Sequence, residues 1–242
     1  MTNQTDINKA VRQHIEMEKF FSGGFTVKSK TDSLKQPEKQ NSSKQNELEA
    51  VATQVAQCRK CELGSLRTNP VPGEGNPDAR LVFIGEGPGA DEDAQGRPFV
   101  GRAGQLLDKM IKAMGLQRSD VYICNIIKCR PPGNRDPKPE EIFQCLPYLQ
   151  RQLEIIQPEI IVALGAHAAR TLLETTKPIG QLRGQFLDYY TSLGKPPIKL
   201  MATFHPAYLL RNYSDDNRRK VWEDLQKVLA ELGLKSPQGS QK

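Results

Sequence analysis

Residues 80–99 read RLVFIGEGPGADEDAQGRPF, an apolar run that leads into a loop rich in glycine and acidic residues. The apolar residues stand next to one another instead of alternating with polar ones, which is typical of a strand covered on both faces of a sheet. Three later runs have the same character: VYICNII at 121–127, EIIVAL at 159–164 and IKLMATF at 198–204. The four runs predict a buried parallel sheet.

Helical patterns lie between the predicted strands. Apolar residues recur at helical spacing over 106–114 and 142–156, and two more helices are expected at 166–174 and 216–232. Strands that alternate with helices pair in parallel through right-handed crossovers. The predicted fold class is therefore α/β, a three-layer α/β/α sandwich with a central four-stranded parallel sheet.

Reactive groups in such folds gather beyond the carboxyl ends of the strands, which here selects residues 85–93, 125–135 and 205–211. The first segment formally matches a glycine-rich dinucleotide-binding pattern. However, Pro88 removes a backbone donor, and the acidic residues at 91–93 would repel a pyrophosphate. The loop instead predicts a pocket for a flat, neutral ring that forms hydrogen bonds.

Composition divides the 242 residues into three parts. Residues 1–48 are expected to form a polar, largely disordered tail with room for a short helix at 7–21, because residues 29–47 contain almost no core-forming side chains. A helix is expected to resume at 47–57. The folded domain is assigned to residues 49–233, and residues 234–242 are expected to form a disordered C-terminal tail.

The chain is basic, with a formal net charge of +6 and a pI near 9.0. This charge favours polyanionic partners such as nucleic acids, although an excess of lysine is also typical of an ordinary solvated surface. No apolar stretch approaches the ~20 residues that a membrane-spanning helix needs. We therefore expect a soluble, cytoplasmic monomer without a membrane partner.

Four of the five cysteines have the spacing of ligands to one inorganic centre, with a C-x2-C pair at Cys58 and Cys61 followed by Cys129 and Cys145. Four thiolates can bind zinc or an iron–sulfur cluster, and the spacing does not choose between them. Disulfides are less expected, because the cysteine count is odd and no secretory segment is evident. Cys124 lies inside an apolar run and is predicted to be a core residue.

Three motifs, together with the four spaced cysteines, closely resemble the family 4 uracil-DNA glycosylases, the iron–sulfur members of that superfamily. The motifs are GEGPGADEDAQGRPFVGRAGQLL (85–107), CNIIKCRPPGNR (124–135) and HPAYLLR (205–211). The resemblance covers roughly residues 50–232. It implies a uracil-DNA glycosylase-like catalytic domain with a [4Fe–4S] cluster on the four spaced cysteines.

The resemblance also implies an activity and a partner. The enzyme would extrude uracil from single- or double-stranded DNA and hydrolyse its N-glycosidic bond, which leaves an abasic site and starts base excision repair. Phe99 would stack on the base, and the Asn125 amide would donate to uracil O4 and accept from N3–H. His205 would donate to O2, where negative charge develops on the departing base.

The residue that activates water is less clear from the sequence. The best-known members of the superfamily carry an aspartate where Gly87 stands here, so Glu86 is the nearest substitute. Glu92, by family analogy, would line the side of the pocket that excludes the C5 methyl group of thymine. His14 and His167 are expected to be ordinary residues without a catalytic role.

DNA contacts are expected on both sides of the pocket. Residues 207–210 form an apolar segment that could wedge into the base stack, and basic residues nearby would contact phosphates. The predicted DNA-binding residues are Lys128, Arg130, Arg135, Arg183, Leu209 and Arg211.

Two other classes of function fit parts of the sequence. A non-catalytic nucleic-acid-binding module could use the same thiolates to hold a structural zinc ion. A partner-recruiting protein could instead depend on the polar tail. Within the enzyme class, a glycosylase for a broader range of deaminated bases is the alternative to a uracil-specific enzyme.

Overall fold

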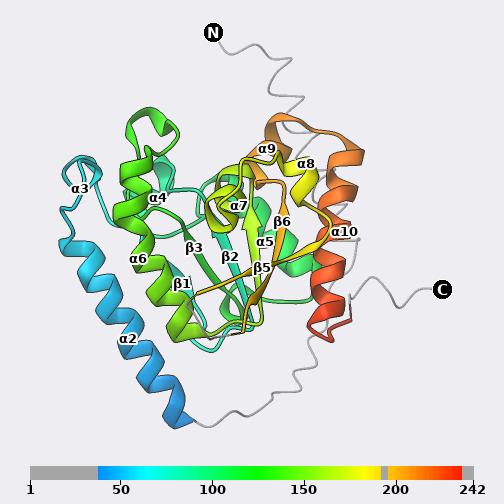
Figure 1. Ribbon diagram of the computed structural model, residues 1–242, viewed down its shortest axis with the longest axis horizontal. Helices are drawn as coiled ribbons and strands as arrows, with labels where there is room; N and C mark the ends of the chain where they lie inside the picture. The colour runs from blue at the N-terminus through cyan, green and yellow to red at the C-terminus, as the bar shows by residue number, and fades with distance from the viewer. Residues whose placement is uncertain (1–37, 192–195, 236–242) are drawn as a thin grey trace.

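The computed structural model describes residues 38–191 and 196–235, arranged around a central sheet (Figure 1). The sheet has six strands in the order β1-β3-β2-β4-β6-β5. Their bounds are β1 Glu74–Gly75, β2 Leu81–Gly85, β3 Tyr122–Asn125, β4 Ile160–Leu164, β5 Phe186–Tyr189 and β6 Ile198–Thr203. The four predicted strands form the parallel centre of the sheet, so the predicted fold class is confirmed.

The predicted sheet had four strands, whereas the observed sheet also has two edge strands, β1 and β5. Both pair antiparallel with their neighbours. β1 has only two residues, and β5 is mostly half-buried or exposed. Neither strand therefore has the continuous apolar run by which the central strands were recognised.

Helices cover both faces of the sheet. Their bounds are α2 Glu38–Gln57, α3 Leu63–Leu66, α4 Ala90–Gln95, α5 Arg102–Ala113, α6 Pro139–Ile156, α7 Ala166–Leu173, α8 Ile179–Leu182, α9 Pro206–Arg211 and α10 Asp215–Glu231, with short 3₁₀ turns at Arg118–Asp120 and Pro132–Asn134. Successive residues of each strand face opposite sides of the sheet. Val82 and Ile84 of β2 pack with α2, α6 and α7, whereas Leu81 and Phe83 pack with α5 and α10. This two-sided burial explains the uninterrupted apolar runs.

Helix α2 corrects the predicted linker. It begins at Glu38 and not near Glu47, so the second half of the polar stretch at 29–47 is helical. The helix packs against α6, with Leu48 buried, and Lys44 Nζ lies 2.8 Å from Asp78 Oδ1. The predicted helix at 7–21 and residues 236–242 lie outside the described part of the chain, and the domain boundaries stay predictions. Every helix in the described ranges is too short or too polar to span a bilayer.

Candidate active site

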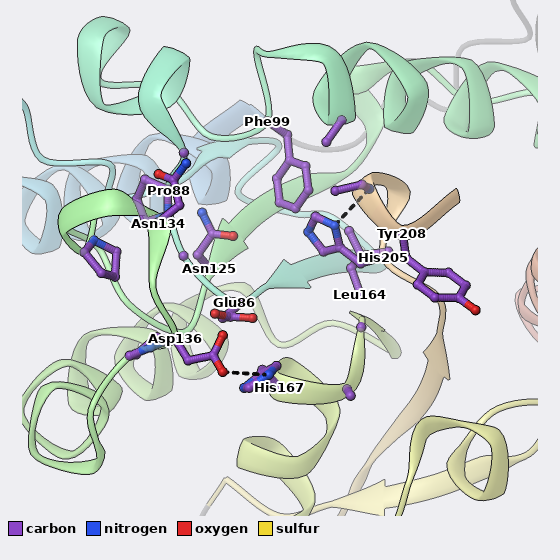
Figure 2. Close-up of a pocket in the computed structure, with 18 of the residues that line it drawn as sticks. Glu86, Pro88, Phe99, Asn125, Asn134, Asp136, Leu164, His167, His205 and Tyr208 are labelled. Atoms are coloured by element: carbon purple, nitrogen blue, oxygen red, sulfur yellow. Dashed lines mark hydrogen bonds and ion pairs between the residues drawn. The ribbon is translucent and has the colours of Figure 1, made fainter. Parts of the chain in front are cut away.

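A single pocket collects the loops that follow the four parallel strands. It has a volume of about 610 Å³ and is lined by residues at or after the ends of β2, β3, β4 and β6 (Figure 2). In the strand order, β3 lies on one side of β2 and β4 lies on the other, so the direction in which strands are added reverses at β2. Such a reversal leaves a crevice at the carboxyl edge of an open α/β sheet. The pocket therefore lies where the fold predicts a ligand.

Asn125, the last residue of β3, contributes an unusual polar group to this pocket. Its side chain is 1% exposed, and its Oδ1 atom has no hydrogen-bond partner within the described residues. A buried acceptor without a partner costs about 1–3 kcal/mol, so such groups are rare unless a ligand satisfies them. The amide is thus prepared to bind a molecule that enters the pocket.

Phe99 and Asn125 approach each other closely because residue 85 is a glycine. A Cβ atom at Gly85 would lie 2.4 Å from Asn125 Oδ1 and 2.6 Å from the Phe99 ring. Phe99 itself has a φ of 51°, a left-handed conformation that is strained for an aromatic residue. Its buried ring lies beside that of His205, with the two ring centroids 5.6 Å apart. Figure 2 shows Phe99, Asn125 and His205 around one part of the pocket.

Glu92 holds this strained turn in place. One carboxylate oxygen accepts the backbone N–H groups of Val100 and Gly101 at 2.8 and 2.9 Å, and the other accepts that of Gly89 at 3.1 Å. Glu92 also lines the pocket, as does Gly87, where a Cβ atom would meet the Ile127 side chain at 2.8 Å. The Glu92 carboxylate is therefore a rigid wall, fixed by three backbone donors.

His205 begins helix α9, and its hydrogen bonding defines its tautomer. Its Nδ1 atom accepts the backbone N–H of Ala207 at 3.0 Å. Burial, followed by the positive charge of Arg211, lowers the pKa of His205 to about 4. The imidazole is therefore neutral near pH 7 and carries its proton on Nε2. The protonation state, which the sequence left open, follows from this arrangement.

Glu86 directly follows β2 and lines the pocket beside two residues that the sequence analysis did not assign to the site. Asp136 and His167 each bring a side-chain ligand atom within 4.8 Å of Glu86 and of each other. His167, which the sequence analysis expected to have no catalytic role, lines the pocket. His167 is the second residue of α7, directly after β4, so the carboxyl-end rule applied to β4 would have found it.

Lys128 was wrongly predicted to contact DNA. Its side chain is fully buried, and Nζ donates to the Asn125 backbone carbonyl at 2.9 Å and to Gln152 Oε1 at 2.6 Å. Burial lowers its pKa. The lysine connects β3 to α6 underneath the pocket and cannot reach a phosphate.

Arg183 and Leu209 also have structural positions that contradict a direct DNA contact. Arg183 Nη2 lies 2.8 Å from Oδ1 of the fully buried Asp224, and its guanidinium packs over the Phe204 ring. Leu209 is 1% exposed and belongs to the core beside α5. Residues 206–211 form helix α9, in which the other three residues of the predicted wedge, Ala207, Tyr208 and Leu210, are half-buried.

The remaining predicted DNA contacts lie at or beside the pocket. Arg135 and Arg211 line it, and Arg130 Nε donates to Asn134 Oδ1 at 2.8 Å. Arg135 forms a two-bond ion pair with the buried Glu141. Arg211 is exposed at the end of α9. These cations form a basic rim on both sides of the opening.

The four spaced cysteines lie near one another, although they come from three parts of the chain. Cys58 and Cys61 follow α2, Cys129 follows β3, and Cys145 lies in α6. Burial, together with the nearby Cys129 and Cys61, raises the pKa of the Cys145 thiol to about 11. All four pack against the core cluster beneath α2 and α6, or belong to it.

Two polar groups point at these sulfurs. Arg67 Nη1 donates to Cys129 Sγ at 3.1 Å, and the backbone N–H of Lys128 donates to Cys145 Sγ at 3.2 Å. Such donors stabilise thiolate negative charge. The donor set is therefore four thiols with supporting hydrogen bonds.

Known proteins identify the family to which this arrangement belongs. The profile of the uracil DNA glycosylase superfamily matches residues 72–226. The type-4 uracil-DNA glycosylase of Thermotoga maritima is 51% identical over 182 residues, covering 75% of this chain and 92% of the relative. The type-4 uracil-DNA glycosylase of Sulfurisphaera tokodaii is 46% identical over 192 residues, covering 77% of this chain and 85% of the relative. That of Archaeoglobus fulgidus is 45% identical over 195 residues, covering 78% of this chain and 96% of the relative. The chain therefore belongs to the uracil DNA glycosylase superfamily and, within it, to the type-4 uracil-DNA glycosylases.

Proposed function

We propose that this protein extrudes uracil from DNA and hydrolyses its N-glycosidic bond, leaving an abasic site for base excision repair. The observation that carries the proposal is the buried, unpartnered Oδ1 atom of Asn125 in the pocket. The Asn125 amide can accept from uracil N3–H through Oδ1 and donate to O4 through its NH2 group. Cytosine has an amino group and a bare N3 at these positions, so both bonds would be lost.

The walls of the pocket suit a flat pyrimidine. Phe99 offers an aromatic face on which the extruded base can stack. Glu92, held by three backbone donors, stands where it can exclude the C5 methyl group that distinguishes thymine from uracil. Specificity for uracil thus depends on the Asn125 amide and on the fixed position of the Glu92 carboxylate.

His205 assists departure of the base. When the bond between C1′ and N1 breaks, its electron pair stays with uracil, and negative charge spreads to O2. A neutral histidine with its proton on Nε2 can donate a hydrogen bond to that oxygen, while the bond from Ala207 to Nδ1 keeps the ring oriented. A fixed donor of this kind contributes roughly 10²–10³ in rate. Glu86, at the end of β2, is the proposed contact for the attacking water.

The proposal is tested by release of free uracil from a single-stranded oligonucleotide that contains one uracil. We expect the wild-type protein to release it and Asn125→Ala to lose at least about 100-fold in single-turnover rate, because the base loses both polar contacts. Gln117→Ala, which removes an exposed amide remote from the pocket, is the matched control and should retain full activity. Normal cleavage by Asn125→Ala would refute the assignment.

We also propose that Cys58, Cys61, Cys129 and Cys145 hold a [4Fe–4S] cluster, which would fix the loop after β3 against α2 and α6. A tetrahedral zinc site with Zn–S bonds of about 2.3 Å needs sulfur atoms about 3.8 Å apart. The four thiols, with the hydrogen bonds donated to Cys129 Sγ and Cys145 Sγ, support a thiolate-bound centre, and analysis of bound iron, sulfide and zinc distinguishes the cluster from a zinc ion.

The fifth cysteine provides the control for this second proposal. Cys145→Ala is expected to reduce bound iron and sulfide and to remove the visible absorbance, whereas Cys124→Ala should retain them, because Cys124 is a fully buried residue of β3. Stoichiometric zinc without iron in the wild-type protein would contradict the cluster and support the structural-zinc alternative.

The substrate range and setting follow from the same site. We infer that the enzyme acts as a monomer on uracil in both single- and double-stranded DNA, in the cytoplasm where DNA is accessible. Arg130, Arg135 and Arg211 supply the basic rim that would contact phosphates. Competition between uracil-containing and hypoxanthine-containing oligonucleotides distinguishes a uracil-specific enzyme from one of broader specificity.

A further inference from the structure

Three acid–base side chains meet on one side of the pocket, each from a different part of the fold. Glu86 follows β2, Asp136 follows the 3₁₀ turn at Pro132–Asn134, and His167 lies in the first turn of α7. His167 Nε2 is 3.5 Å from Asp136 Oδ2. Figure 2 shows the three side chains converging below Asn125, on the side of the pocket away from Phe99. The buried, unpartnered amide oxygen of Asn125 lines the same pocket.

The size of this group fits one water molecule. The three ligand atoms all lie within 4.8 Å of one another. Three atoms that lie within 4.8 Å of one another always leave a point within about 2.8 Å of all three, so one water oxygen can reach each at an ordinary hydrogen-bond length. Two carboxylates and an imidazole also provide the two acceptors and the donor that a bound water can use.

We propose that Asp136 and His167 are positioning residues that, together with Glu86, hold the water that captures the deoxyribose after uracil departs. The inference rests on the proposed function and deepens it. In the proposed function Asn125, Phe99 and His205 hold the base. The second group lines the same pocket on the side away from Phe99, so a water held there shares the cavity with the extruded nucleotide.

The step balances with water as the sole co-reactant. The bond from C1′ to N1 breaks, and its electron pair leaves with uracil. The water oxygen then forms a bond to the cationic C1′, and its proton passes to the Glu86 carboxylate. Glu86 then releases this proton to solvent and the uracil anion takes one from solvent, so the products are free uracil and an abasic deoxyribose. The carboxylates of Glu86 and Asp136 also stabilise the positive charge of the sugar before capture.

The two neighbours affect Glu86 in opposite directions. Burial raises the pKa of Glu86, the positive charge of protonated His167 lowers it, and the negative charge of Asp136 raises it. The other titratable or charged residues that line the pocket are Glu92, Arg135, His205, Tyr208 and Arg211. Glu86 must be ionised to accept the proton, so its pKa determines the acidic limb of the pH–rate profile.

The test measures single-turnover uracil release against pH for the wild type, His167→Gln and Asp136→Asn. Both variants are expected to lose roughly 10- to 100-fold in rate at pH 8, with the affinity for uracil-containing DNA changed by less than about threefold. The acidic limb should move to higher pH in His167→Gln and to lower pH in Asp136→Asn. A merely structural role would not shift the limb in opposite directions.

Surface changes of matched charge serve as controls. Lys112→Gln removes an exposed positive charge on α5, and Asp188→Asn removes an exposed negative charge on β5, so neither should alter rate or pH profile. An active wild type whose two pocket variants keep its rate and profile would overturn this inference alone. A divalent-cation requirement, seen as loss of activity in EDTA and recovery on adding Mg²⁺, would also overturn it. A wild type that releases no uracil would overturn the proposed function as well.

Discussion

His205 illustrates how one hydrogen bond determines the chemistry of a residue. Its Nδ1 atom caps α9 by accepting from the Ala207 N–H, which directs the single ring proton to Nε2. A positively charged imidazole would lose this acceptor, because both ring nitrogens would then be donors. Burial, followed by the positive charge of Arg211, lowers the pKa of His205 and so keeps this acceptor available to the helix.

The low pKa of His205 predicts a pH dependence of folding stability. In the unfolded chain a histidine titrates near 6.5, whereas His205 in the folded protein titrates at about 4. The unfolded state thus binds more protons between these values, and stability falls as the pH falls through this window. Chemical denaturation at pH 7 and pH 4.5 should show that His205→Gln loses about 2 kcal/mol less stability than the wild type. Equal losses would contradict a buried, neutral His205.

At the scale of single residues, the sequence predicted which residues line the pocket better than it predicted which cations are buried. The motifs selected both Asn125 and Phe99, the carboxyl-end rule also selected Asn125, and both residues line the pocket. Lys128 and Arg183 were assigned to DNA because a basic residue in a loop usually faces solvent. Their partners, Gln152 and Asp224, are distant in sequence, so local composition could not reveal that either cation is buried.

Among the elements, β3 and α6 are tied together beneath the site by Lys128. Its Nζ bonds the Asn125 backbone and Gln152, while the Gln152 amide donates to the Pro72 carbonyl at 2.8 Å and to the Tyr122 hydroxyl at 3.1 Å. The position of Asn125 thus depends on contacts with helix α6 behind the sheet. This network explains how a residue that touches no substrate can affect recognition.

Lys128→Met tests this connection, because methionine keeps much of the length and removes the donors. Two buried acceptors lose their partner at about 1–3 kcal/mol each, so we expect the free energy of unfolding to fall by roughly 2–4 kcal/mol. Uracil release should also slow, while the salt dependence of DNA binding stays that of the wild type. Lys112→Met, at an exposed position of α5, is the control. A reduced salt dependence in Lys128→Met would restore the original assignment to phosphate contact.

The central strands were predictable because they are buried on both faces and therefore have continuous apolar runs. The edge strands β1 and β5 lack such runs and were not predicted. Helix α2 lies between these cases. Its first half is polar, but Lys44 pairs with Asp78 and donates to the Ile156 carbonyl at 3.2 Å, and these contacts with distant parts of the chain support a helix where composition indicates a linker. Tertiary contacts of this kind override local propensity.

For the whole molecule, a net charge of +6 becomes informative once the buried cations are separated from the exposed ones. Lys128 and Arg183 are occupied by internal partners, whereas Arg211 is exposed at the pocket opening. A polyanion is attracted by the cations that it can reach, and each phosphate contact releases counterions. The basic rim, and not the overall charge, is therefore expected to determine the electrostatic part of DNA binding.

Two arginine variants separate these contributions when the dissociation constant for DNA is measured over a series of salt concentrations. Arg211→Ala is expected to weaken binding at low salt and to reduce the slope of log K against log salt by about 1, because one phosphate contact is lost. Arg183→Ala should keep the slope and instead lower stability by about 3–5 kcal/mol, because it leaves the fully buried Asp224 carboxylate without its cation. If Arg183→Ala reduced the slope while Arg211→Ala kept it, the DNA path would have to run over α8 and α10 and not along α9. That outcome would separate the DNA track from the pocket opening, since Arg211 lines the pocket and Arg183 does not.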